Sequence, residues 1–188
     1  MFNKIAVIGL GYVGLPLALE FGKYFDTVGY DINQRRIEEL KKNFDSTGEC
    51  EEPEILNSTS CSFSANLDEI RDAEFYIITV PTPIDGAKKP DLSMLKAASK
   101  TVATVLSAGN YVVYESTVFP GATREVCIPI LENISGLELN KNLFVGYSPE
   151  RINPGRNRQK LTEIIKVTSG SSPKAAENID KLYSCIIK

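Results

Sequence analysis

Three glycines near the start of the chain have the spacing of a phosphate-binding loop. Gly9, Gly11 and Gly14 form a G-x-G-x-x-G pattern between the apolar runs 5–8 and 15–21. In this geometry the first glycine permits a tight turn, the second lets backbone approach a pyrophosphate, and the third lets helix and strand pack closely. Because the N-terminus of a helix attracts negative charge, this stretch predicts a dinucleotide-binding loop.

Asp31 supplies a carboxylate at the interval that dinucleotide binding requires. It ends the expected strand 27–31 and lies about 20 residues beyond Gly9, where an acid meets the adenosine ribose. The alternative is an aspartate that caps the helix beginning at Asn33. Arg36 follows on that helix and could reach the adenosine end of a dinucleotide or pair with a neighbouring glutamate.

Small hydroxyl and acidic side chains follow three further expected strands. They are Thr82 after the run 75–80, Ser116 and Thr117 after 111–115, and Glu150 after 143–147. Each hydroxyl could instead cap a helix, and the acid could lie in an exposed loop. Since the carboxyl ends of parallel strands meet at one edge of a sheet, these groups should converge with the glycine loop. The convergence favours hydride transfer with a nicotinamide cofactor, with a water held by hydroxyl and carboxylate relaying protons.

The elements that must position these groups alternate between strand and helix. Strands are expected at 5–8, 27–31, 61–64, 75–80, 111–115, 143–147 and 164–168, and helices at 15–21, 33–44, 67–73, 92–106, 122–133 and 173–187. Pro129 should kink or divide the helix 122–133. Crossovers of this length keep the strands parallel, which predicts one Rossmann-like, doubly wound α/β domain over residues 1–188 with helices on both faces of the sheet.

Composition excludes several classes of protein. With no histidine, the chain cannot build a Ser-His-Asp site, a Cys-His site or a His-ligated metal site, and no metal is expected. The net charge of −3 argues against a nucleic-acid partner, and no apolar run approaches the ~20 residues of a membrane helix. The chain starts almost directly in a strand, so no signal peptide and a cytoplasmic location are expected. The four cysteines lack metal-like spacing and suggest reduced thiols, with Cys185 in the core.

Four motifs in a fixed order span nearly the whole chain. They are Gly-Leu-Gly-Tyr-Val-Gly-Leu-Pro at 9–16, Val-Pro-Thr-Pro at 80–83, Glu-Ser-Thr-Val-Phe-Pro-Gly at 115–121 and Ser-Pro-Glu-Arg-Ile-Asn-Pro-Gly at 148–155. Together they resemble the UDP-glucose/GDP-mannose dehydrogenase family. The last motif is most similar to the branch that oxidises UDP-N-acetylhexosamines for bacterial surface polysaccharides. The resemblance implies a UDP-sugar whose C6 alcohol becomes a carboxylate in two NAD-dependent oxidations, through an enzyme thioester.

The resemblance also implies roles for individual residues. Besides Gly14 of the glycine loop, the residues at NAD would be Gly9, Gly11, Tyr12, Val13, Asp31, Arg36, Thr82 and Thr117. Thr117 and Glu150 would be the catalytic partners of a water, and Glu150, Arg151, Ile152 and Asn153 would lie against the sugar. The family's nucleophilic cysteine and catalytic lysine belong to downstream motifs that this sequence does not contain. An N-terminal fragment, inactive alone, is therefore expected, from a homo-oligomer assembled through a later central helix.

Two other interpretations stay open from the sequence. A hydroxyacid dehydrogenase would share the domain plan, although the Ser-Pro-Glu-Arg turn at 148–151 argues against it. A regulatory or redox-sensing dinucleotide-binding domain would need no catalysis. The residues encoded after Lys188 would separate that domain from an enzyme, because only the enzyme needs the glycine-rich cysteine motif.

Overall fold

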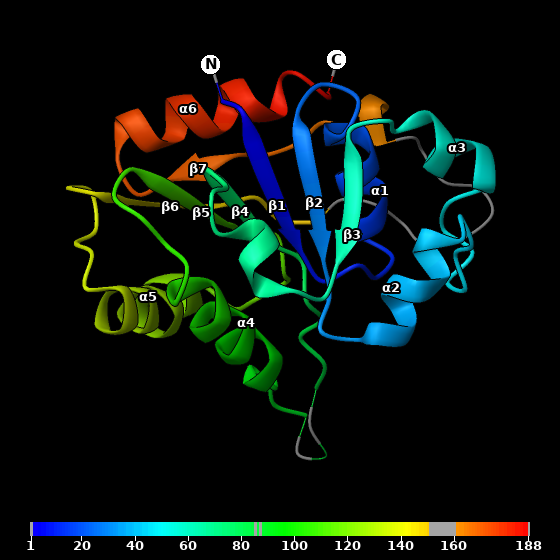
Figure 1. Ribbon diagram of the computed structural model, residues 1–188. Helices are drawn as coiled ribbons and strands as arrows, with labels where there is room; N and C mark the ends of the chain where they lie inside the picture. The colour runs from blue at the N-terminus through cyan, green and yellow to red at the C-terminus, as the bar shows by residue number, and fades with distance from the viewer. Residues whose placement is uncertain (1, 85, 87, 151–160, 188) are drawn as a thin grey trace.

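The molecule is built on one seven-stranded sheet. The computed structural model describes residues 2–84, 86, 88–150 and 161–187 (Figure 1). The strands are β1 (Lys4–Ile8), β2 (Asp26–Tyr30), β3 (Cys61–Ser64), β4 (Phe75–Ile78), β5 (Asn110–Tyr114), β6 (Leu143–Tyr147) and β7 (Ser169–Gly170). Their order is β3-β2-β1-β4-β5-β6-β7, and every pairing is parallel except that of β7 with β6. The predicted doubly wound fold is confirmed, with the strand order reversing between β1 and β4.

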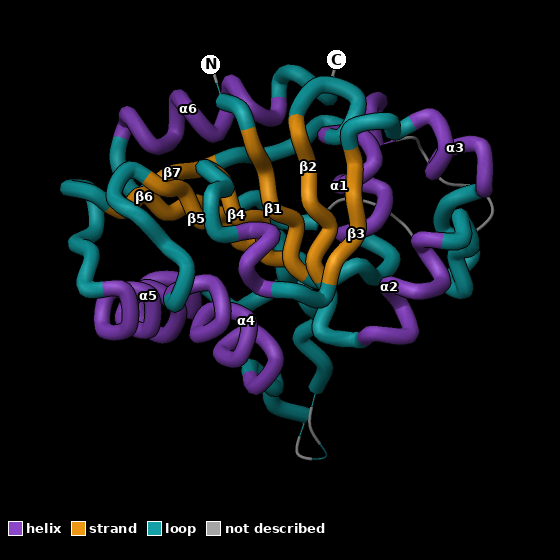
Figure 2. The backbone as a smooth tube through the Cα atoms, in the orientation of Figure 1, coloured by secondary structure: helices purple, strands orange, loops and turns teal. Residues whose placement is uncertain are grey.

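Helices cover both faces of this sheet, so the molecule has three layers (Figure 2). They are α1 (Gly14–Phe21), α2 (Gln34–Lys41), α3 (Glu52–Asn57), α4 (Ser93–Ala103), α5 (Ile128–Ser135) and α6 (Pro173–Tyr183), with the short turns η1 (Leu67–Ile70), η2 (Thr123–Cys127) and η3 (Leu161–Glu163). None of the helices in the described part of the chain is long and apolar enough to cross a bilayer.

The two faces of each central strand feed two separate cores. Along β1, Ile5 and Val7 pack with the apolar sides of α1 and α6, whereas Ala6 and Ile8 pack with those of α4 and α5. All four side chains are buried. Burial on both faces is what a parallel sheet requires, and it explains why the run 5–8 is apolar without alternation.

Two local expectations have different outcomes. The helix expected at 122–133 is divided, as predicted: η2 is a π-type turn, and α5 begins beside Pro129, whose missing N–H suits a first turn. The strand expected at 164–168 is wrong, because only Ser169 and Gly170 pair with β6. Ile165 is 85% exposed, so the apolar pattern there does not mark a buried strand.

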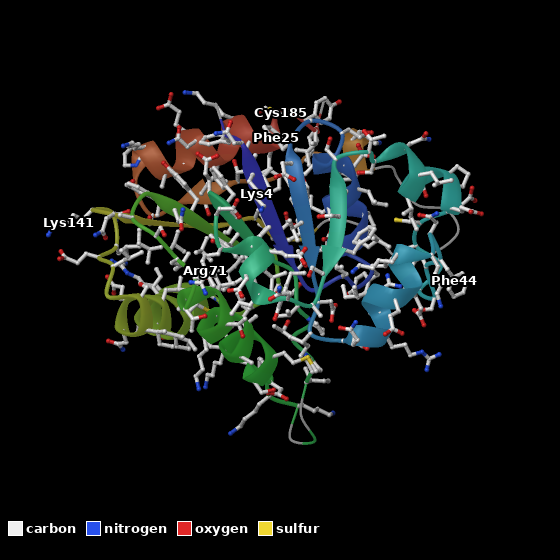
Figure 3. All side chains as sticks on the ribbon, in the orientation of Figure 1. Lys4, Phe25, Phe44, Arg71, Lys141 and Cys185 are labelled. Carbon is white, nitrogen blue, oxygen red and sulfur yellow. The ribbon has the colours of Figure 1, made fainter. Side chains whose placement is uncertain are left out.

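Cys185 is not the core residue that its apolar surroundings predict. Helix α6 ends at Tyr183, and the thiol two residues later is exposed and donates to Lys181 O over 3.3 Å. Figure 3 places it at the end of α6, on the opposite side of the molecule from the loop that follows β4. The segment after Tyr183 still packs on the core through Ile186, which is 2% exposed, but Cys185 lies on its exposed side.

Candidate functional site

The glycine loop after β1 is held in place by the end of β2 and by the residue that follows β4. Gly9 has φ +94° and its N–H donates to Tyr30 O over 2.8 Å, while the Thr79 hydroxyl donates to Gly9 O over 2.7 Å. A Cβ on Gly14 would lie 1.8 Å from Gly9 O, so α1 can approach the loop only with glycine there. A Cβ on Gly11 would meet no atom within 4 Å. Gly11 is therefore not needed for internal packing.

The start of α1 has the features of an anion site. Val13 at its N-cap makes no side-chain hydrogen bond, and the first turn carries no acidic residue. A helix N-terminus without a side-chain cap offers N–H groups and a partial positive charge to a ligand. Together with the open space above Gly11, this donor set fits a pyrophosphate.

Asp31 stands just beyond β2, with its carboxylate fixed by backbone. Oδ2 accepts from Leu10 N over 2.8 Å and Oδ1 from Asn33 N over 2.9 Å. The cap of α2 is Asn33, whose side chain accepts from Arg35 N and Arg36 N, so Asp31 does not cap that helix. Since each carboxylate oxygen can accept more than one hydrogen bond, Asp31 retains capacity for a ribose hydroxyl.

Two cavities meet at the carboxyl edge of the sheet. One, of about 480 Å³, is lined by Gly9, Gly11, Asp31 and the apolar side of α4, including Met94. The other, of about 310 Å³, is lined by Gly11, Tyr12, Val13, Thr79, Val80, Pro81, Thr82, Pro83, Glu115, Ser116, Thr117 and Glu150. Because the two share Gly11 and residues 79–81, they form a continuous path across the point where the strand order reverses. Their sizes lie in the range of ligand pockets, about 300–1,000 Å³.

The turns after β4 and β5 are tied to each other. The Thr82 hydroxyl donates to Thr117 O and the Ser116 hydroxyl donates to Val80 O, each over 2.5 Å. Thr82 and Thr117, predicted as cofactor residues from separate motifs, thus lie side by side in the wall of the smaller cavity. The Thr117 side chain is not used to cap a following helix, since the cap of η2 carries no side-chain bond.

Arg36 lies behind the glycine loop. Its side chain is 8% exposed; Nε donates to Leu10 O over 2.9 Å, and Nη2 lies 2.7 Å from Asp45 Oδ1. Glu39 is farther away, at 3.9 Å from Nη1. Arg36 lines neither cavity, so its expected contact with the adenosine end stays a prediction. In the described contacts it supports the loop that carries Gly11.

Three buried residues at this edge were missed by sequence reasoning. They are Glu115, Lys166 and Tyr183, which form a cluster described below. The available signal was Glu115 itself, a charged residue that closes the otherwise apolar run of β5 and must find a partner. The predicted sugar contacts Arg151, Ile152 and Asn153 lie outside the described residues. The part of the chain that the structure describes contains no group of acidic or cysteine side chains able to hold a metal ion.

Comparison with known proteins identifies the family. The family model for the NAD binding domain of UDP-glucose/GDP-mannose dehydrogenases matches residues 3–187. The chain belongs to this family. It is 54% identical over 184 residues to a UDP-N-acetyl-D-glucosamine 6-dehydrogenase of Pseudomonas aeruginosa, and 49% identical over 187 residues to Protein CapL of Staphylococcus aureus. The family predicted from the four motifs is confirmed, and its NAD binding domain is the part that this chain represents.

Solved structures of the family share the fold. A UDP-D-ManNAc dehydrogenase from Pyrococcus horikoshii superposes with a TM-score of 0.88 at 36% identity, over 98% of this chain and 45% of that chain. The alignments with the two bacterial relatives likewise cover 98% and 100% of this chain but 44% of each relative. The chain thus spans less than half the length of the relatives that it matches.

Proposed function

We propose that this chain is the NAD-binding domain of a nucleotide-sugar 6-dehydrogenase that oxidises the C6 alcohol of a UDP-N-acetylhexosamine to a carboxylate. The observation that carries the proposal is the path of two joined cavities, with Asp31 at one end and Thr117 and Glu150 at the other. The substrate class is supported by 54% identity to a relative that bears that activity in its name. A cytoplasmic location and a homo-oligomer belong to the same proposal.

The cofactor would lie along the path with its adenosine end at Asp31. The carboxylate would accept from a ribose hydroxyl, Gly11 would leave room for the pyrophosphate, and the N-terminus of α1 would bind its charge. Tyr12, Val13 and Thr82 would enclose the nicotinamide end. When bound, the nicotinamide ring supplies the hydride acceptor for both oxidations.

Thr117 and Glu150 would handle water and protons at that end. Both line the smaller cavity, and one carboxylate oxygen of Glu150, Oε2, is buried. A carboxylate beside a hydroxyl can orient a water and accept its proton, which is the role of a general base in forming the acid. The four residues 150–153 would continue along the sugar.

The experiment is an assay of the complete protein with UDP-N-acetylglucosamine and its galacto and manno isomers. We expect two NADH for each sugar oxidised, because converting an alcohol to a carboxylate removes two hydrides. Glu150→Gln should lower kcat by about 100-fold or more, in the range typical of general base catalysis. Tight NAD binding without turnover of any of these sugars would contradict the enzymatic proposal and favour a regulatory dinucleotide-binding domain.

A further inference from the structure

A buried cluster of charged and polar side chains lies directly behind the smaller cavity. Lys166 Nζ is 2.6 Å from Glu115 Oε2, and the two side chains are 2% and 1% exposed. The Tyr183 hydroxyl donates to Glu115 Oε1 over 2.5 Å, which occupies the other carboxylate oxygen. Glu115 also lines the cavity, so this cluster forms part of its wall.

The cluster joins elements that carry the site. Glu115 directly follows β5, and Tyr183 is the last residue of α6. Lys166 comes from the segment between η3 and β7, and its Nζ also donates to Pro149 O over 3.4 Å. Pro149 precedes Glu150 in the turn after β6, which is the strand next to β5. One ammonium group therefore contacts the end of β5 and the turn that presents Glu150.

Stability alone is a poor explanation for this arrangement. Two charges taken out of water pay a desolvation penalty, and well-packed apolar side chains often serve as well or better. Burial raises the pKa of Glu115 and the nearby Glu150 adds to the rise, while Lys166 and Tyr183 counter it. Burial likewise raises the pKa of Tyr183, so the phenol stays a hydrogen-bond donor. Without Lys166, the Glu115 carboxylate would remain buried in the cavity wall near Glu150, without the ammonium group that offsets its burial.

Such a carboxylate has two ways to relieve the cost of its burial. Because Glu115 lines the cavity, its side chain would turn into that space or take up a proton, and either change alters the wall that faces the nicotinamide end. The larger cavity, around Asp31, is lined by neither Glu115 nor Glu150 and would be unaffected. The cluster should therefore matter for one half of the dinucleotide only.

We propose that Lys166 is a positioning residue for the nicotinamide end of the site: it fixes the Glu115 carboxylate and the Pro149 carbonyl, and through them the placement of Glu150. This inference rests on the proposed function, because it assumes that the smaller cavity receives the nicotinamide. It adds to that function a residue that contacts neither cavity and that no motif contains. A purely structural role, in which the cluster only holds α6 in place, would instead affect ligand binding in both cavities equally.

The test compares two ligands, NAD and ADP-ribose, by calorimetric titration of the 188-residue chain. ADP-ribose lacks only the nicotinamide ring and keeps the adenosine, the pyrophosphate and the second ribose, so a loss of affinity confined to NAD reports on the surroundings of that ring. We expect Lys166→Met to weaken NAD binding by about tenfold, the equivalent of one lost hydrogen bond to a charged group, and ADP-ribose binding by less than about twofold. Lys166→Arg should recover most of the NAD affinity, because a guanidinium can still pair with the carboxylate.

The matched control is Lys181→Met on α6. Lys181 pairs with Glu177 on the surface, where the two side chains are 62% and 64% exposed, and its loss should change neither affinity. Should Lys166→Met fail to fold, Tyr183→Phe removes one hydrogen bond to Glu115 without removing charge. That variant should weaken NAD binding by about threefold and leave ADP-ribose binding unchanged.

Each outcome supports or overturns the inference. Equal losses of affinity for NAD and ADP-ribose would show that the cluster only supports the fold. Unchanged NAD affinity in both Lys166→Met and Tyr183→Phe would show that the cluster has no role in binding. Both results overturn the positioning role while leaving the proposed function intact. Failure of the unmodified chain to bind NAD would instead overturn the proposed function, and this inference with it.

Discussion

At the scale of single residues, Gly11 and Gly14 allow a direct comparison between a glycine proposed to serve ligand binding and one needed for packing. A methyl group on Gly11 enters open space, whereas one on Gly14 collides with Gly9 O. We therefore expect Gly11→Ala to change the unfolding free energy of the ligand-free chain by less than about 0.5 kcal/mol and to weaken NAD binding by about tenfold. Gly14→Ala should destabilise the chain itself by about 3 kcal/mol through overpacking.

Chemical denaturation and calorimetry on the two variants measure both effects. A large loss of stability in Gly11→Ala with unchanged NAD affinity would mean that the residue serves only the turn. The structure makes that result surprising, since Gly11 does not have a positive φ and alanine can adopt its backbone conformation.

Asp31 should set the choice between NAD and NADP. Its carboxylate, fixed by Leu10 N and Asn33 N, accepts from a ribose 2′-hydroxyl but repels a 2′-phosphate. We expect the chain to bind NAD at least about tenfold more tightly than NADP, a difference of about 1.4 kcal/mol. Asp31→Ala should reduce this difference between the affinities for NAD and NADP. Calorimetric titration with both cofactors decides the matter, and equal or tighter binding of NADP would contradict the assignment.

At the scale of an element, the loop after α2 is held together by one buried carboxylate, that of Asp45. Asp45, whose side chain is fully buried, accepts from Thr47 N, Glu49 N and Cys50 N and pairs with Arg36. Burial opposes ionisation of this carboxyl, but the hydrogen bonds from Thr47, Cys50 and Arg36 outweigh it and lower the pKa of Asp45. Arg36 also donates to Leu10 O, so one side chain is bonded both to the loop after α2 and to the glycine loop after β1.

Asp45→Asn should therefore be strongly destabilising near neutral pH. Removing the charge leaves Arg36 buried without its partner, at a cost of about 3 kcal/mol. Because the folded-state pKa is lowered, the contribution of Asp45 is complete above the unfolded pKa of about 3.9 and is lost as pH falls through the folded pKa. Urea unfolding at a series of pH values should show the difference between variant and native chain shrinking below about pH 4.

The control for this series is Asp68→Asn. Asp68 is 74% exposed and pairs with Arg71 on the surface, so its loss should change stability by less than about 1 kcal/mol. If Asp45→Asn behaved like this control at pH 7, the buried pair with Arg36 would have no energetic role. A difference that grew in acid would contradict the direction of the pKa shift.

At the scale of the whole molecule, we expect this chain to bind cofactor without oxidising a sugar nucleotide. A thioester step needs a thiolate at the carboxyl edge, and none of the four cysteines lines either cavity. Burial raises the pKa of Cys61 to about 12 and also raises that of Cys127. Cys185 is exposed on the far side from the loop after β4 (Figure 3). Thiols held protonated or remote from the site are poor nucleophiles for it.

The measurement is NADH absorbance with NAD and UDP-N-acetylglucosamine, or its galacto or manno isomer. No signal above background is expected from the purified 188-residue chain. Sustained production of NADH that Cys185→Ser abolishes would show that this exposed thiol reaches the substrate, and it would contradict the argument from position.

Local patterns in the sequence determined the sheet, the glycine loop and the family. Apolar runs followed by glycine, proline or hydroxyl residues predicted β1, β4, β5 and β6, because a parallel strand buried on both faces needs an apolar run whatever its neighbours are. Gly14 could be read from spacing alone, since the close approach of α1 to the loop after β1 depends on residues adjacent in the chain.

Only the tertiary structure decided which distant side chains meet. Glu115 and Lys166 lie 51 residues apart in the chain and pair because the end of β5 and the segment before β7 meet in the fold. Lys166 lies in the segment where a strand was expected, yet only Ser169 and Gly170 pair with β6. Exposure of Cys185 was likewise decided by the turn after α6, which directs Ile186 into the core and leaves Cys185 outside. Periodicity reports which face of an element is apolar, but the partner of a buried charge depends on which elements fold against each other.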